Sequence, residues 1–95
     1  MSEDVGTSAG QESEEIVAEA ISRQRTVQVG VDVDGYTSQV QLSEAVRSWD
    51  SRRIGESVVK VAAVAHDRYV VLTDKSGTTS LTAEQVAAAE RELDF

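Results

Sequence analysis

The chain has 95 residues, which is enough for one small domain. It contains no cysteine and a single histidine, which excludes disulfides, thiolate metal sites and a thiol nucleophile and argues against a zinc site. The net charge of −8 is uneven, because residues 1–22 carry −6, residues 23–75 carry +1 and residues 76–95 carry −3.

The first predicted element is a disordered acidic tail, residues 1–12, and the remainder, residues 13–95, forms a single small α+β domain. The tail is rich in Ser, Gly, Glu and Asp and has little apolar surface to bury. Beyond it, Ile16 and Ala20 stand four positions apart, behind a serine that can cap a helix. We therefore expect a short first helix over residues 13–23.

A β-hairpin is predicted next, because residues 26–33 and residues 36–43 both alternate between apolar and polar or small side chains. A two-residue turn at Asp34–Gly35 would join the strands, since Asp-Gly supplies the positive φ angles of a type I′ turn. This register places the apolar side chains on one buried face. The expected pairs are Val33–Tyr36, Val31–Ser38, Val29–Val40 and Val27–Leu42.

The aspartates of this turn also have the spacing found in the middle of a calcium loop. Such a loop would put Gly30 at its first ligand position and Gln41 at its last, so two essential ligands are missing. The hairpin turn is the favoured interpretation, and we expect no metal and no cofactor. The sequence also lacks a phosphate-binding loop, a nucleophile elbow and a paired-carboxylate site, which argues against an enzyme.

A long amphipathic helix is predicted from Ile54 onwards, where apolar residues recur three and four positions apart. Asp50 or Ser51 can cap its start. Residues 69–72 are β-like in composition, and the sequence leaves open whether they continue the helix or form a strand. Lys75 and the residues after it are expected to end the element.

A short C-terminal helix is predicted over residues 83–93, because Thr82 and Gln85 form a capping box. The expected order is helix, antiparallel hairpin, long amphipathic helix and short helix. A two-stranded layer is marginal alone and leaves unpaired backbone groups at its edges. We therefore expect the protein to form a homodimer.

Cationic side chains surround the single tryptophan in the segment between the hairpin and the long helix. The candidate residues for contact with a partner or with phosphate are Arg47, Trp49, Arg52, Arg53 and Lys60. Arginine and tryptophan are frequent at binding hot spots, and arginines contact phosphates. Alternatively, Trp49 packs over the end of the hairpin, while the arginines are solvated or paired with Asp50 and Glu56.

One segment, residues 25–68, resembles the YbaB/EbfC family of small nucleoid-associated proteins. In that family two strands joined by a glycine-containing turn lead into a helix with spaced apolar residues. The matching pieces here are Val27 to Val33, Asp34–Gly35, Val40 to Leu42, and Ile54, Val58, Ala62 and Ala65. The segment is more closely similar to small actinobacterial proteins associated with ESX (type VII) secretion. Those matches are Arg25–Thr26–Val27, Asp34–Gly35, Val40, Leu42–Ser43 and Val46.

The resemblance implies a YbaB-like fold and a non-enzymatic, dimeric, chaperone-like accessory protein of type VII secretion that binds a protein partner. The alternative is a YbaB-like nucleoid-associated protein that binds DNA phosphates through the arginines of the cluster and Lys60. Trp49 is followed by Asp50 and Ser51, so it does not begin the Trp-x-Gly turn of secreted type VII substrates. Neither a secretory signal nor an apolar run long enough to cross a membrane is visible, so we expect a cytoplasmic protein without membrane insertion.

Overall fold

The computed structural model describes residues 15–74, 77 and 79–95, so the predicted acidic tail lies outside the described residues. The elements are the strands β1 (Ile16–Ile21), β2 (Val27–Asp32) and β3 (Thr37–Leu42), the 3₁₀ helix η1 (Glu44–Ser48), and the helices α2 (Ser51–Thr73) and α3 (Ala83–Arg91). The strands form one antiparallel sheet in the order β1-β2-β3. The α+β class is confirmed.

The predicted first helix is wrong, because its described part forms β1, which pairs antiparallel with β2. Ala18 and Ala20 point into the core while Glu19 between them is exposed, which is the two-residue period of a strand. Pairing with β2 satisfies backbone groups that a two-stranded layer would leave open. This tertiary contact overrides the weak helical preference of the segment.

The hairpin of β2 and β3 is confirmed, and so are the predicted pairs Val29–Val40 and Val27–Leu42. The other two pairs are wrong. A β-bulge after Gly30 places Val31 opposite Thr37, and the predicted Val33–Tyr36 pair falls within the connecting loop. The bulge adds one residue to β3, so the ladder is shifted at the turn end and intact toward Leu42.

The turn itself is longer than predicted. The carbonyl of Asp32 accepts a hydrogen bond from the N–H of Gly35 at 3.0 Å, and the N–H of Asp32 donates to the carbonyl of Tyr36 at 2.9 Å. Gly35 has φ +86°, so the loop is a three-residue connection with its glycine in the left-handed region. The Asp32 carboxylate accepts from the N–H groups of Asp34 and Tyr36, so it stabilises the turn.

Both predicted later helices are confirmed. Asp50 is the N-cap of α2, and its carboxylate accepts from the N–H of Arg53 at 2.8 Å. The β-like residues 69–72 belong to this helix, which ends at Thr73. The predicted capping box starts α3, with Thr82 and Gln85 bonding each other's backbone N–H groups.

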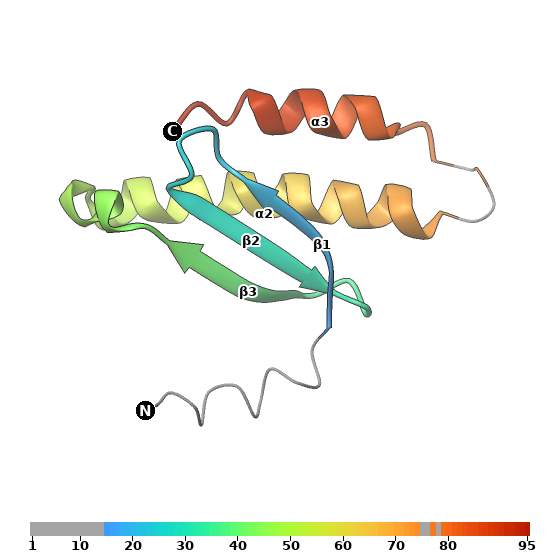
Figure 1. Cartoon of the computed structure of the whole chain (residues 1–95), viewed down its shortest axis with the longest axis horizontal. Helices are drawn as coiled ribbons and strands as arrows, with labels where there is room; N and C mark the ends of the chain where they lie inside the picture. The colour runs from blue at the N-terminus through green and yellow to red at the C-terminus, as the bar shows by residue number, and fades with distance from the viewer. Residues whose placement is uncertain (1–14, 75–76, 78) are drawn as a thin grey trace.

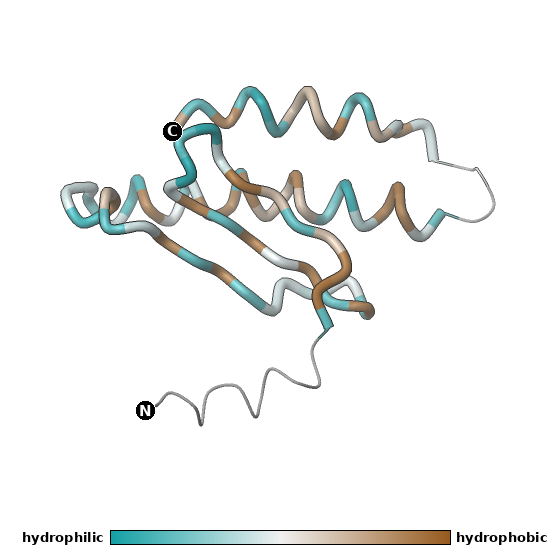
Figure 2. The backbone as a smooth tube through the Cα atoms, viewed as in Figure 1, coloured by the Kyte–Doolittle hydropathy of each residue, from teal (hydrophilic) through white to brown (hydrophobic). Residues whose placement is uncertain are grey.

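The core lies between the sheet and α2. Figure 1 shows α2 crossing one face of the sheet, with α3 and β3 on opposite sides of it. Most of the buried hydrophobic residues come from β1, β2 and α2, and hydrophobic positions recur along these three elements in Figure 2. The fully buried members of the core include Val27, Val29, Val31 and Val61. α2 covers mainly β1 and β2 and touches β3 only slightly.

Candidate interaction surface

The predicted cluster around Trp49 is partly engaged in packing. The guanidinium of Arg53 lies 3.9 Å from the centre of the Trp49 ring, in cation–π geometry. The ring of Phe95 meets Trp49 edge-on, with the ring centres 6.2 Å apart and an angle of 82°. Trp49 is half-buried against the core, so it anchors the C-terminal segment.

The other candidate cations of the cluster are exposed. Arg52 pairs with Glu56 one turn along α2 at 3.5 Å, with 88% and 65% of the side chains exposed. Such surface pairs contribute little to stability. Arg47 lies on η1, and Lys60 lies about two turns beyond Arg52 on α2. The structure therefore brings Arg53 and Trp49 together and leaves Lys60 apart from them.

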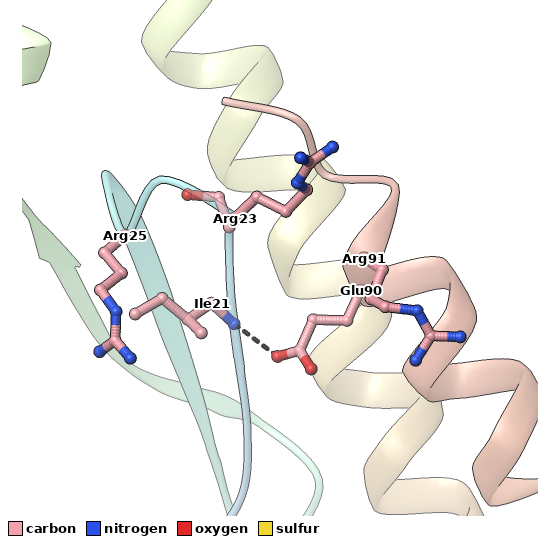
Figure 3. A pocket seen from close by; sticks show the side chains of 6 residues that line it. Ile21, Arg23, Arg25, Glu90 and Arg91 are labelled. Carbon is pink, nitrogen blue, oxygen red and sulfur yellow. Dashed lines mark hydrogen bonds between the residues drawn. The ribbon is translucent and has the colours of Figure 1, made fainter.

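A second group of arginines, which the sequence did not indicate, lies where the turn between β1 and β2 meets the end of α3. Arg23, Arg25 and Arg91 line a small pocket with Ile21 and Glu90. Figure 3 shows that the three guanidinium groups diverge around the pocket and do not converge on one point. The carboxylate of Glu90 turns inward to the backbone of Ile21, so the pocket is built around an existing hydrogen bond.

This carboxylate closes the outer edge of β1. Glu90 accepts from the N–H of Ile21 at 2.9 Å and forms a two-pronged ion pair with Arg68 at 3.1 and 3.2 Å. Arg68 also donates to the carbonyl of Glu19 at 2.6 Å. Two backbone groups of this edge are therefore bonded to side chains from α2 and α3.

The ionisation of Glu90 also makes the stability of these contacts depend on pH. Burial alone would raise the pKa of Glu90, but the hydrogen bonds from Arg68 and Ile21 and the charge of Arg68 together lower it below 4.5. Because the pKa of Glu90 is lower in the folded state than in the unfolded state, the ionised carboxylate stabilises the fold at pH values above about 4.5. This stabilisation is lost as the pH falls through the folded-state pKa.

We expect Glu90→Gln to remove part of the acid sensitivity of the fold. The free energy of unfolding of the unmodified chain should fall more steeply below about pH 4.5 than that of the variant, because a glutamine side chain at this position does not titrate. Urea denaturation at several pH values measures this difference. Identical slopes for the unmodified and Glu90→Gln chains would contradict the expectation.

The turn beside this edge is covered by the C-terminal segment. The N–H of Arg23 donates to the carbonyl of Leu93 at 2.8 Å, and the N–H of Gln24 donates to the main-chain oxygen of Phe95 at 3.1 Å. Thr26 donates its hydroxyl proton to the same oxygen of Phe95 at 2.8 Å. The C-terminal end of β1 and the turn after it are therefore held by side chains of α2 and α3 and by the residues that follow α3.

The opposite edge, along β3, has no such cover in the described part of the chain. Val40 and Leu42 point to the α2 side of the sheet but remain 45% and 46% exposed. The apolar residues of β3 therefore lie on the predicted face, but this face is only partly covered at β3 because α2 lies mainly over the other two strands. From Tyr36 to Ser43 the chain has no charged residue, and charges and prolines are the usual protections of an edge strand.

The flank of α2 that faces β3 is apolar as well. Tyr69 identifies this flank, because its hydroxyl donates to the carbonyl of Val33 and its ring lies against Gly35. Val58 and Ala62 share the flank by helical spacing and are half-buried. We call this flank together with the apolar side of β3 the β3 surface. It is a candidate interaction surface, since it combines an open strand edge with partly exposed apolar side chains.

Among the described residues, no three His, Cys, Asp or Glu side chains gather in a group that could hold a metal ion. Within the same residues, no helix is both long and apolar enough to cross a membrane. Comparison with known proteins gives no match to a family model, to a curated protein or to a solved structure.

Proposed function

We propose that the chain is a non-enzymatic, homodimeric protein-interaction module that acts as a chaperone-like accessory of type VII secretion in the cytoplasm. The observation that supports dimer formation is the open, charge-free edge of β3 with Val40 and Leu42 half-exposed beside it. Unpaired strand edges with apolar neighbours are sites where a second chain adds to a sheet. The link to type VII secretion is supported by the resemblance of residues 25–68. DNA binding, the alternative from that resemblance, stays a prediction.

The distribution of charge supports the use of this surface between identical chains. Each chain carries a net charge of −8, so two copies repel one another at most orientations. β3 bears none of that charge, and Glu19, the acidic residue within β1, lies on the strand at the far edge of the sheet. Contact through β3 therefore brings together two strands that carry no charged side chain.

We expect Val40→Lys to shift the protein toward monomer, because a lysine on an edge strand opposes pairing with another strand. The unmodified chain should sediment as a dimer at tens of micromolar, and the dissociation constant of Val40→Lys should rise by about tenfold or more, as for the loss of ~1.4 kcal/mol. Val59→Lys is the matched control, because Val59 is 67% exposed on the outer side of α2. A monomeric unmodified chain at this concentration would remove the proposal.

The same pair of variants tests the accessory role. In a host that uses a type VII system, replacement of the natural chain by Val40→Lys should reduce export of type VII substrates and leave general secretion unchanged. The Val59→Lys chain should support normal export. Equal export with both variants would separate the dimer from secretion and overturn the accessory role.

A further inference from the structure

The backbone groups that β3 presents at its free edge follow from the hydrogen-bond ladder with β2. The N–H of Ser43 donates to the carbonyl of Thr26 at 2.9 Å, so these two residues form a hydrogen-bonded pair. Such pairs alternate with non-bonded pairs in an antiparallel ladder. Gln41 and Gln39 therefore direct their N–H and C=O groups toward β2, whereas the alternate residues Val40 and Leu42 direct theirs outward.

An independent contact supports this assignment. Val27 stands opposite Leu42 in the ladder, and both backbone groups of Val27 are used on the β1 side. Its carbonyl accepts from the N–H of Ser22 at 3.0 Å, and its N–H donates to the Ser22 hydroxyl oxygen at 3.2 Å. Leu42 therefore has no backbone partner on β2, and its N–H and C=O face the open edge.

Both the backbone groups and the side chains of Val40 and Leu42 are therefore available to a partner. Their backbone groups point out of the sheet edge, and their side chains are 45% and 46% exposed on the α2 side. An occupant that satisfies both must be an extended segment that runs along β3 and carries apolar side chains on the same face. Within the described part of the chain, β3 of a second copy meets both requirements, because its own Val40 and Leu42 present the same backbone groups and apolar side chains.

We propose that two copies join through antiparallel pairing of β3 with β3, with Gln41 on the two-fold axis. This inference rests on the dimer proposed above and assigns its interface. Val40 then pairs with the partner's Leu42, and Leu42 pairs with the partner's Val40. Each of these two pairs exchanges two backbone hydrogen bonds. The apolar side chains meet on the α2 face, while Gln41 meets the partner's Gln41 on the opposite face.

The bulge near the turn selects this register over its neighbour. An axis at Val40 would place Leu42 opposite the partner's Ser38, which replaces an apolar contact by a polar one. Ser38 also lies in the bulged part of β3, between the pairs of Gln39 and Thr37, where the regular ladder is broken. An axis at Gln41 keeps the new ladder within the regular half of the strand.

The absence of cysteine in the sequence permits a direct test by cross-linking. In the proposed register, Gln41 and the partner's Gln41 form a non-hydrogen-bonded pair with Cα atoms about 4.5 Å apart. That distance is within the roughly 4.4–6.8 Å range of disulfides. Gln41→Cys should therefore form a covalent dimer under mild oxidation.

Gln39→Cys is the matched control, because it changes the same residue type on the same face of the same strand. Gln39 lies opposite the partner's Ser43, so the two cysteines of a Gln39→Cys dimer are four residues out of register, or roughly 13 Å apart along the strand. We expect this variant to stay uncross-linked on non-reducing gels. A mixture of Gln39→Cys and Ser43→Cys chains should form the mixed covalent dimer.

Sedimentation of each variant under reducing conditions tests dimer formation separately from the position of the two-fold axis. A dimer in which Gln41→Cys cross-links and Gln39→Cys does not supports the assigned axis. A dimer in which Gln41→Cys fails, or in which Gln39→Cys alone cross-links, overturns the axis and leaves the proposed function in place. A monomer at tens of micromolar for the unmodified chain overturns both.

Discussion

Replacement of Arg68 by methionine is expected to lower the free energy of unfolding by about 2–3 kcal/mol. Methionine keeps much of the apolar stem but removes the bonds to Glu90 and to the carbonyl of Glu19. The side chains of Arg68 and Glu90 are only 29% and 23% exposed. Without Arg68, the carboxylate of Glu90 would therefore stay partly desolvated and unpaired. Thermal unfolding followed by circular dichroism should show a midpoint lower by roughly 10–20 °C.

Two further variants identify the cause of this loss. Arg52→Met removes the exposed pair with Glu56 and should change the midpoint little, since such pairs are solvated. The double variant Arg68→Met with Glu90→Leu should recover much of the loss, because it removes the orphaned carboxylate as well. A single Arg68→Met variant as stable as the unmodified chain would show that the closure of β1 does not depend on this ion pair.

The second large effect is expected for Ser22→Ala. The Ser22 side chain is 1% exposed, and its oxygen accepts from the backbone N–H groups of Thr26 at 3.1 Å and Val27 at 3.2 Å. Because Thr26 donates its hydroxyl proton to Phe95, the Ser22 hydroxyl must donate to Thr26 across the 2.9 Å between them. Alanine would leave two buried N–H groups without a partner, at a cost of about 3 kcal/mol.

Urea denaturation measures this loss, and Ser48→Ala is the matched control. Ser48 is exposed on η1, where its hydroxyl makes one bond to the carbonyl of Ala45, so its removal should have little effect on stability. A Ser22→Ala variant as stable as the Ser48→Ala control would contradict the role given to the buried hydroxyl.

Local signals explain which parts of the fold could be predicted. The caps of α2 and α3 use residues at most three positions from the N–H groups they bind, so Asp50 and Thr82 are visible in sequence. β1 could not be distinguished from a helix, because alanines and isoleucines within six residues satisfy both periods. Its identity depends on the backbone of β2, which lies beyond the intervening turn.

The turn and the interaction surface could also be predicted only in part from the sequence. Alternation predicted the pairs of Val29 and Val27, but the bulge and the three-residue loop depend on bonds of the Asp32 carboxylate and on the φ angle of Gly35. The charge-free run of β3 was visible in sequence. Which edge is open was not, because Glu90 closes β1 from a helix 69 residues after Ile21.

The closure of β1 also limits how large an assembly the sheet can build. A sheet with two open edges would add copies without end, whereas this sheet has one edge bonded to Arg68 and Glu90. In the proposed dimer, each copy uses its open edge on the other, so the joined sheet ends on both sides at β1, where the N–H of Ile21 and the carbonyl of Glu19 are already bonded to side chains. The two-fold symmetry of this dimer is closed, and we expect Arg68 and Glu90 to oppose the addition of a further strand at β1.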